Sequence, residues 1–398
     1  MTSAFQGTSG VSTTQQGILS GVRIIELAGY VAGPGACGLM ADWGAEVIKV
    51  ESRTGDPFRH FFAGVGQDVV ENRVFDADNR GKQSVVIDIG TPDGAAMLRS
   101  LVLSADVFVT SYRPASLARA GIVWEELHAA KPSLILASFT GYGPIGPDAD
   151  RPGFDITAFW ARSGLCSIMS VKDGDPVVLR TGIGDHMAAT GLAAAIMGAL
   201  YHRERTGMGQ KVETSLLRMG VYAASSEHAV QLQFGRVAST KARPQAVNPL
   251  NNFFRTADGR WIVCVPRQGA NDFPRFARAA GHPEWIEDER FRGNRARKAN
   301  GPALVEMLDA AFGAMPFDTA AAALEREGVI WAPILTLAQA ALDPQAQAAG
   351  CFVAVPQDDG GSVVLPNGPI DFGAFPAPRR RRAPRLDEHG EAIRGSLG

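Results

Sequence analysis

The pair Gly184-Asp185 stands at the expected start of a long helix rich in small residues, over residues 185–205. An aspartate of ordinary pKa, ~3.9, is ionised at neutral pH, so its carboxylate is available as a nucleophile. The helix N-terminus favours such a carboxylate by ~0.3–1 kcal/mol, and a preceding glycine leaves room for a substrate to approach. The same pattern is typical of an ordinary helix N-cap. By residue type alone, Asp185 is therefore either a covalent nucleophile or a cap.

A second pattern, Gly33-Pro-Gly-Ala-Cys-Gly38, is a literal G-x-G-x-x-G between an expected strand and an expected helix. In dinucleotide-binding folds such glycines follow the strand directly and turn backbone N–H groups toward a pyrophosphate. Here residues 28–32 intervene, and Pro34 has no N–H to offer. The pattern favours a tight strand-to-helix turn with close helix–sheet packing, and leaves a nicotinamide-dependent oxidoreductase open as an alternative.

Other polar residues have structural interpretations. Asp155 is expected to be structural or orienting, and Glu26 and Glu51 lie at strand ends where a solvated role is ordinary. His186 follows Asp185 directly, but neighbours on a helix point to different faces, so the spacing does not indicate direct help. The basic run at residues 379–382 is flanked by prolines and is expected to be a solvated segment.

The elements that position these residues alternate between strand and helix in the first half of the chain. Strands are expected at residues 22–27, 46–51, 84–89, 106–111 and 134–139, with helices between several of them, as at 35–43 and 93–103. This alternation predicts an α/β fold with a parallel, Rossmann-like sheet covered by helices. A further helix is expected at residues 216–234.

The second half of the chain has a different pattern of expected strands and helices. We expect a flexible tail at residues 1–18, a large α/β domain at 19–235, a linker at 236–249 and a smaller α+β domain at 250–335. The small domain should hold one strand, 261–266, and helices near 271–280, 302–315 and 318–326. Residues 340–398 should complete the large domain and contribute a strand at 362–365.

Composition excludes several classes of protein. The 398 residues carry a formal net charge of −2, which gives no electrostatic reason to expect nucleic acid or an anionic membrane as partner. The four cysteines are scattered, which argues against disulfides and zinc and favours the cytoplasm. No apolar run reaches ~18 residues, so no membrane span is expected, and the first residues lack the pattern of a signal peptide.

Longer stretches resemble the class III CoA-transferases, the formyl-CoA and carnitine CoA-transferase type. The resemblance covers residues 19 to about 385 and rests on the order of its motifs: residues 19–26, 30–34, 44–51, Asn79-Arg-Gly-Lys82, 106–114, 140–147, Gly184-Asp185 and 202–210. It implies a CoA-binding α/β domain, an interlocked homodimer, and an enzyme that moves CoA from an acyl-CoA to a free carboxylic acid.

The resemblance also implies site residues and a mechanism. Asp185 would attack the thioester to give an acyl-aspartyl anhydride and then an aspartyl-CoA thioester, with no metal or permanent cofactor and with coenzyme A as a substrate. Residues implied in CoA contact are Val31, Ala32, Arg53, Ser111, Tyr112, Arg113, Arg119, Arg151, Gly153 and Phe154. Each of these arginines could equally be a solvated surface charge.

Departures from the family pattern narrow the chemistry. Formyl-CoA transferases have Gln where this chain has Val31, and their Gly-rich loop is replaced here by residues 266–271. The related 2-methylacyl-CoA racemases have a proton-moving His where this chain has Phe154, which disfavours that alternative. A non-catalytic acyl-CoA-binding protein is disfavoured by the retained Asp185. Residues 152–162 and 184–186 are similar to the subgroup acting on aryl-lactates and other 2-hydroxy acids, and Val31, Phe154 and Phe159 would suit a bulky acyl group.

Overall fold

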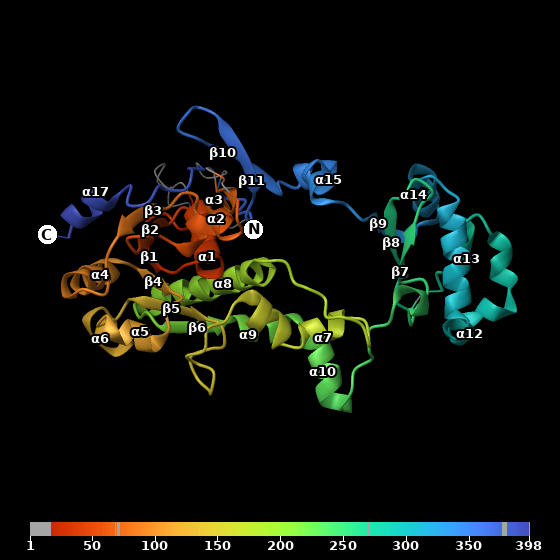
Figure 1. Cartoon of the computed structure of the whole chain (residues 1–398), viewed down its shortest axis with the longest axis horizontal. Coiled ribbons are helices and arrows are strands. Elements are labelled where there is room, and N and C mark those ends of the chain that lie inside the picture. The colour runs from red at the N-terminus through yellow and green to blue at the C-terminus, as the bar shows by residue number, and fades with distance from the viewer. Residues whose placement is uncertain (1–16, 68, 70–71, 270, 376–379, 398) are drawn as a thin grey trace, which may run out of the picture. The chain divides into compact units, whose positions relative to one another are not determined.

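The structure is a computed structural model that describes residues 17–67, 69, 72–269, 271–375 and 380–397. The chain divides into two compact units. Unit 1 comprises the described residues up to Ser167, Val178–Arg236 and the residues from Ala348 onward, and unit 2 comprises Ile168–Val177 and Val237–Gln347. The colour ramp of Figure 1 shows that unit 1 takes chain from both ends of the sequence. The predicted boundaries did not anticipate that Ile168–Val177 belongs to unit 2.

Unit 1 is built on a six-stranded sheet in the order β3-β2-β1-β4-β5-β6, and every neighbouring pair is parallel. The strands are β1 (Arg23–Leu27), β2 (Glu46–Glu51), β3 (Gln83–Val86), β4 (Val107–Thr110), β5 (Ile135–Thr140) and β6 (Lys211–Ser215). The predicted parallel α/β sheet is confirmed. Its sixth strand was missed, because β6 is a short edge strand of mostly polar residues, Lys-Val-Glu-Thr-Ser.

Alternate residues of the strands supply two apolar cores, one on each face of the sheet. On one face Ile24 and Val109 pack with helices α1 (Ala32–Asp42) and α8 (Ile183–Thr206). The other face is covered by α4 (Pro92–Ser104), α5 (Pro114–Arg119), α6 (Trp124–Ala130) and α17 (Gly390–Gly395).

Helix α8 is the one helix among the described residues that is long and apolar enough to cross a membrane by length and composition. The helix includes Asp185, Arg203 and Glu204, so it is not an uninterrupted apolar run of the kind not found in the sequence. The helix packs against α1, β5 and β6 inside unit 1, and its Arg203 pairs with Asp106 at 2.7 Å. A core helix of a folded domain passes the same test.

Further elements complete the chain. The predicted helix at 216–234 is two helices, α9 (Leu216–Ala223) and α10 (Ser225–Phe234). The predicted strand at 362–365 is β11 (Ser362–Pro366), which forms an antiparallel hairpin with β10 (Phe352–Pro356). The remaining short helices are η1 (Pro57–His60), α2 (Phe61–Gly64), α3 (Arg73–Asn79), the π-helical turn η2 (Asp155–Ala161), α7 (Leu165–Met169) and α16 (Pro344–Ala348).

The described residues after the masked segment 376–379 close the outer edge of β3. The backbone N–H of Val86 donates to Asp387 Oδ1 at 2.8 Å, and the N–H of His389 donates to the Ser84 carbonyl at 3.0 Å. Before them, Arg380 pairs with the buried Asp42, and Arg382 pairs with Asp358 and Glu388 at 2.7 and 2.5 Å. For Arg380 and Arg382, the expectation of a solvated run is therefore wrong, while Arg379 lies outside the described residues.

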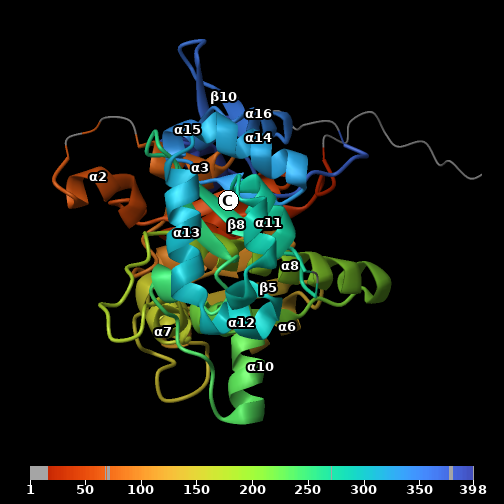
Figure 2. The ribbon, with the colours of Figure 1, turned by 90° about the vertical axis from the view of Figure 1, so that its right-hand side faces the viewer.

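Unit 2 has its own antiparallel sheet, β7 (Asn252–Arg255), β8 (Trp261–Val265) and β9 (Ile330–Pro333), where one strand was predicted. Its helices are η3 (Arg243–Gln245), α11 (Phe273–Ala279), η4 (Pro283–Glu287), η5 (Glu289–Phe291), α12 (Gly293–Ala299), α13 (Gly301–Gly313), α14 (Phe317–Glu327) and α15 (Leu337–Ala341). Phe254, Phe276 and Phe312 are fully buried in its core, whose helices face the viewer in Figure 2. Arg243, in the stretch expected to be a linker, pairs with Asp309 of α13 at 2.6 Å.

Candidate active site

The strand order of unit 1 reverses between β1 and β4, and ligands of such sheets bind at the carboxyl ends of the strands at this switch point. The turn after β1 and the segment after β4 meet there. The N–H of Ser111 donates to the Leu27 carbonyl at 3.3 Å, and the N–H of Gly29 donates to Ser111 Oγ at 3.4 Å. Both segments were predicted to contact CoA.

Asp185 lies in the first turn of α8, but it is not the cap. Gly182 is the N-cap residue, in the left-handed region at φ 89°, so the N-cap interpretation of Asp185 is wrong. Within the described residues, no group donates a hydrogen bond to the Asp185 carboxylate. Burial raises the pKa of Asp185 to about 7, the negative charges of Asp155 and Asp78 add to this rise, and His186 opposes it. The expectation of an ordinary aspartate pKa is therefore wrong.

Asp155 fixes the residue at which this helix begins. Its side chain is buried, and Oδ2 accepts the backbone N–H of Gly182 at 2.8 Å while Oδ1 accepts that of Ile156 at 2.8 Å. Both oxygens are thus occupied by backbone donors. The carboxylate joins η2 to the start of α8, in line with an orienting role.

His186 makes two contacts that the sequence did not indicate. Its Nδ1 lies 2.7 Å from the Gly182 carbonyl oxygen, and its Nε2 lies 3.1 Å from Asp78 Oδ1 of α3. The hydrogen bond and the negative charge of Asp78 raise the pKa of His186 to about 9. The imidazole is therefore cationic at neutral pH.

Gly184 is required by packing. A Cβ built at Gly184 would lie 2.6 Å from Cδ1 of the Phe159 ring and 3.0 Å from Asp155 Cβ. The space beside this glycine is occupied by a buried phenylalanine, so the expectation that it makes room for a thioester is wrong. Phe159, which is 5% exposed, is likewise a core residue and does not line an acyl pocket as proposed from the sequence.

The glycines of residues 33–38 also serve packing. They lie inside α1 and do not form a turn that precedes it. A Cβ at Gly38 would lie 2.6 Å from the backbone oxygen of Asp78, and one at Gly35 would lie 3.2 Å from Ala189 Cβ of α8. The glycines bring α1 close to α3 and α8, and their position removes the motif that suggested a nicotinamide cofactor.

Two residues expected to contact CoA line one cavity at the carboxyl ends of the strands. Arg53 and Tyr112 border a cavity of about 250 Å³ together with Leu27 and Ile87. The Arg53 side chain is exposed, and its Nε lies 3.4 Å from Asp88 Oδ2. Such an exposed pair contributes little to stability, so the guanidinium is available to an incoming anion.

The other expected contacts fall into two groups. Val31 and Ala32 are buried where α1 begins. Arg113 reaches the loop that precedes η2, since its Nη1 donates to the Asp150 carbonyl at 2.6 Å, and Arg151 in that loop lies 3.5 Å from Asp148. Arg119, by contrast, makes its one hydrogen bond among the described residues to Ser116 of its own helix.

An exposed aromatic pair lies between the turn after β1 and the start of η2. The rings of Tyr30 and Phe154 meet edge to face with centroids 5.2 Å apart, and they are 44% and 52% exposed. Tyr30 has φ 65°, a conformation that non-glycine residues rarely adopt. Gly153 packs beneath Tyr142, where a Cβ would lie 2.9 Å from the ring. The sequence predicted a site role for Phe154 but not for Tyr30, whose positive φ can be seen only in the folded structure.

A buried ion network supports the turn after β1, and it was not predicted from the sequence. Glu26 is fully buried between Lys49 and Lys82, each at 2.7 Å. Lys49 also pairs with Asp56 at 2.8 Å, and Asp56 Oδ1 accepts the N–H of Tyr30 at 3.0 Å. Burial acts to raise the pKa of Glu26, but the two lysines outweigh it and lower that pKa.

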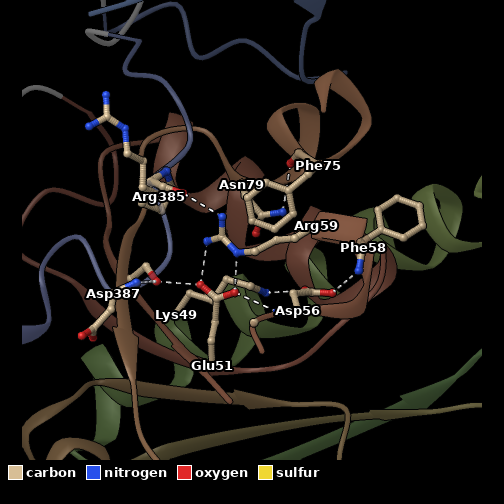
Figure 3. A network of polar contacts seen from close by, with 12 residues as sticks. Lys49, Glu51, Asp56, Phe58, Arg59, Phe75, Asn79, Arg385 and Asp387 are labelled. Atoms are coloured by element: carbon tan, nitrogen blue, oxygen red, sulfur yellow. Dashed lines mark hydrogen bonds and ion pairs between the residues drawn. The ribbon is translucent and has the colours of Figure 1, made fainter. Parts of the chain in front are cut away.

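Figure 3 shows the adjoining part of this network, where Glu51 meets the guanidinium of Arg59. Glu51 is buried and accepts hydrogen bonds from Arg59 at 2.7 Å and from Ser84 Oγ at 2.6 Å, while Arg59 Nη1 donates to the Pro384 carbonyl at 3.1 Å. The expectation that Glu26 and Glu51 are solvated is therefore wrong.

Comparison with known proteins agrees with the resemblance seen in the sequence. Residues 19–390 match the family model described as CoA-transferase family III. An (R)-2-hydroxy-4-methylpentanoate CoA-transferase of Clostridioides difficile is 30% identical over 385 residues, 96% of each chain. A cinnamoyl-CoA:phenyllactate CoA-transferase of Clostridium sporogenes is 36% identical over 278 residues, 69% of this chain and 67% of that one.

A solved structure supports the same assignment. A CAIB/BAIF family protein from Brucella suis superposes with a TM-score of 0.85 at 32% identity, covering 96% of this chain and 100% of that one. The match extends through both units, since the residues aligned are nearly the whole chain. The chain therefore belongs to CoA-transferase family III, whose members are enzymes that transfer coenzyme A.

Proposed function

We propose that this enzyme moves CoA from an acyl-CoA to a free carboxylic acid, with Asp185 as the covalent nucleophile. The observation that carries the proposal is the state of Asp185. Its carboxyl is largely desolvated and accepts no hydrogen bond within the described residues. It lies in the first turn of α8, whose N-cap residue Gly182 approaches Val31, since a Cβ built at Gly182 would lie 4.0 Å from Val31 Cγ1. A carboxylate that nothing in the fold uses is free to attack an electrophile.

The proposed reaction conserves the energy of the thioester. An Asp185 oxygen attacks the acyl carbon, and the C–S bond breaks. CoA departs as its thiolate, and the acyl group and Asp185 are then joined in a mixed anhydride. The thiolate then attacks the Asp185 carbonyl carbon, which releases the donor acid and leaves an aspartyl-CoA thioester. The acceptor carboxylate repeats both steps in reverse and regenerates the Asp185 carboxylate. No step needs a metal or a redox partner.

We propose that the nucleotide end of CoA binds at the cavity that Arg53 and Tyr112 border. Arg53 would exchange its weak contact with Asp88 for a phosphate, and guanidinium groups bind phosphate oxygens in a fork. Arg113 and Arg151 sit further along the same edge, toward η2. Arg119 has no such support, so its predicted contact with CoA is the weakest of the set.

We propose a bulky 2-hydroxy acid as the acyl group. Two relatives carry names that specify 2-hydroxy-4-methylpentanoate and phenyllactate. In this chain, the exposed edge-to-face rings of Tyr30 and Phe154 offer an apolar surface to such a group, where a formyl group would leave it bare. If the enzyme transferred CoA only to one- or two-carbon acids, this substrate assignment would be wrong.

The test combines trapping with a screen. Incubation with hydroxylamine and acetyl-, succinyl- or cinnamoyl-CoA should convert the Asp185 side chain to a hydroxamate, seen by peptide mass spectrometry. CoA exchange against a panel of acids, with phenyllactate and acetate included, identifies the acceptor. A hydroxamate on another carboxylate would overturn the mechanism.

The functional assembly we propose is an interlocked cytoplasmic homodimer. Several large apolar side chains are exposed on the chain by itself, among them Tyr222, Leu232 and Phe234 of the α9–α10 segment, and helix α10 has no buried residue. The cytoplasmic location rests on the scattered spacing of the four cysteines in the sequence, which favours a reducing compartment. A monomer by light scattering at micromolar concentration would contradict the dimer.

A further inference from the structure

The peptide group at Gly182 is held from both sides. Its N–H donates to Asp155 Oδ2 at 2.8 Å, and its carbonyl oxygen lies 2.7 Å from His186 Nδ1. Gly182 is in the left-handed region at φ 89°, which glycine adopts without strain, and the two contacts hold the backbone at the start of α8 in that conformation. Asp185 is three residues further on, and its place depends on that conformation.

His186 is itself anchored from a third element. Its Nε2 lies 3.1 Å from Asp78 Oδ1, and Asp78 is buried on α3. With Nδ1 donating to a carbonyl and Nε2 donating to a carboxylate, both ring nitrogens carry hydrogen, which is the cationic form. The geometry thus defines the charge of the ring as well as its orientation.

Three charged groups from three elements act on Asp185: Asp155 of η2, Asp78 of α3 and His186 of α8. Two are anions that disfavour the ionised nucleophile, and both already have hydrogen-bond partners. His186 is the one cation of the three. Without its charge, a desolvated Asp185 between two anions would be protonated to a larger extent at neutral pH.

We propose that His186 is a positioning residue for the transfer reaction: bound to Asp78, it fixes the Gly182 carbonyl and keeps a positive charge beside the Asp185 carboxylate. The inference rests on the proposed role of Asp185 and adds to it. His186 acts through Asp185, and no atom of the acyl group needs to touch it. The pair His186–Asp78 therefore sets the pH above which the nucleophile is available.

Two substitutions separate the charge from the hydrogen bond. In His186→Asn, the amide nitrogen can take the place of Nδ1 and keep the bond to the Gly182 carbonyl, while the charge is lost. In His186→Lys the charge stays and the ring geometry is lost. The matched control is His202→Asn, an exposed histidine near the other end of the same helix.

The readout is the pH dependence of kcat/KM for the best of acetyl-, succinyl- and cinnamoyl-CoA, whose acid limb reports the free enzyme's nucleophile. We expect a wild-type limb near pH 7, following the pKa of Asp185. In His186→Asn the limb should move upward by roughly one pH unit, with activity largely recovered on the alkaline side. His186→Lys and His202→Asn should keep the wild-type limb.

The outcomes separate this inference from the proposed function. If the wild type forms the Asp185 hydroxamate but His186→Asn keeps the wild-type limb, the role of His186 is refuted and the nucleophile stands. A shift shared equally by His186→Asn and His186→Lys also refutes it, because the limb would then move whether or not the positive charge is kept. If the wild type forms no hydroxamate at Asp185, the proposed function itself fails. Circular dichroism at each pH confirms that the variants are folded.

Discussion

Glu26 and Asp185 of unit 1 are both acidic side chains withdrawn from solvent, and their surroundings are opposite. Below the turn after β1, Glu26 is fully buried, but Lys49 and Lys82 compensate it and its pKa falls. In the first turn of α8, Asp185 is largely buried among other acids with one neighbouring cation, and its pKa rises to about 7. Burial is common to both sites, and the difference lies in the partners.

The comparison distinguishes a structural carboxylate from a reactive one. A compensated charge such as Glu26 holds strands and turns together, and its oxygens are already engaged. An uncompensated, largely desolvated carboxylate such as Asp185 lowers the free energy of unfolding. Proteins retain such a destabilising group where it takes part in catalysis.

The largest expected effect is on activity. Asp185→Asn keeps the shape of the side chain but lacks the charged oxygen, so the rate of CoA transfer should fall by about a thousandfold or more. Binding of CoA should persist, as checked by isothermal titration. Near-normal transfer by this variant would remove the nucleophile from the mechanism.

The next largest effect is a loss of stability when the compensated carboxylate of Glu26 is neutralised. Glu26→Gln leaves Lys82 without its buried counter-charge, and breaking a buried pair costs ~3–5 kcal/mol of unfolding free energy. The matched control on the same sheet is Glu46→Gln, which loses only a half-exposed pair with Arg23 and should cost under ~1 kcal/mol. Urea denaturation measures both. Equal losses would mean that the Glu26 network is not special.

A smaller loss is expected from Gly184→Ala, because its Cβ would meet the Phe159 ring at 2.6 Å. Such overpacking costs ~1–3 kcal/mol, and the displaced first turn should lower the transfer rate as well. Gly198→Ala on the same helix has no atom within 4 Å of its Cβ and should stabilise by ~0.5–1 kcal/mol. Thermal unfolding of the two variants gives the comparison, and a Gly184→Ala protein as stable as Gly198→Ala contradicts the packing role.

The smallest effect tests how much the ionised Asp185 carboxylate lowers the free energy of unfolding. The pKa of Asp185 is higher in the folded state, about 7, than its ordinary value of 3.8. As pH rises between these values, the unfolded chain loses its proton first, so this group destabilises the fold progressively up to about pH 7. Asp185→Asn should therefore be more stable than wild type by ~1–2 kcal/mol at pH 8 and similar to it at pH 4. An unchanged difference across this range would show that the carboxyl is not desolvated.

The sequence predicted the periodic parts of the molecule well and the electrostatic parts poorly. Five strands of the sheet and helix α8 are apolar enough to be recognised, and the motif order identified the family. Strand β6 lacks that apolar signal. The role of Gly184 and the charge on His186 depend on Phe159 and Asp78, residues distant in the chain that only folding brings near.

The same distinction applies to the predicted CoA contacts. The family resemblance implies Arg53 and Tyr112 as CoA contacts, and they border one cavity because parallel strands end at one edge. The resemblance implies Arg119 as well, yet its own helix provides a local partner, Ser116. Neighbours such as Asp88 and Ser116 decide which arginines remain available to bind a phosphate. The spacing of motifs in the sequence does not reveal these neighbours.

The cover of strand β3 by residues 387–389 has a consequence for biosynthesis. Strands β1 to β6 leave the ribosome well before these residues, and the larger segment of unit 2, Val237–Gln347, is translated in between. Until residues 384–389 emerge, the backbone of β3 has an open edge and Arg59 lacks one of its acceptors. Unit 2, whose segments are both complete by Gln347, can fold on the nascent chain first. A ribosome stalled near residue 380 would therefore display a finished small unit beside a sheet with an exposed edge, the state in which a chaperone would be needed most.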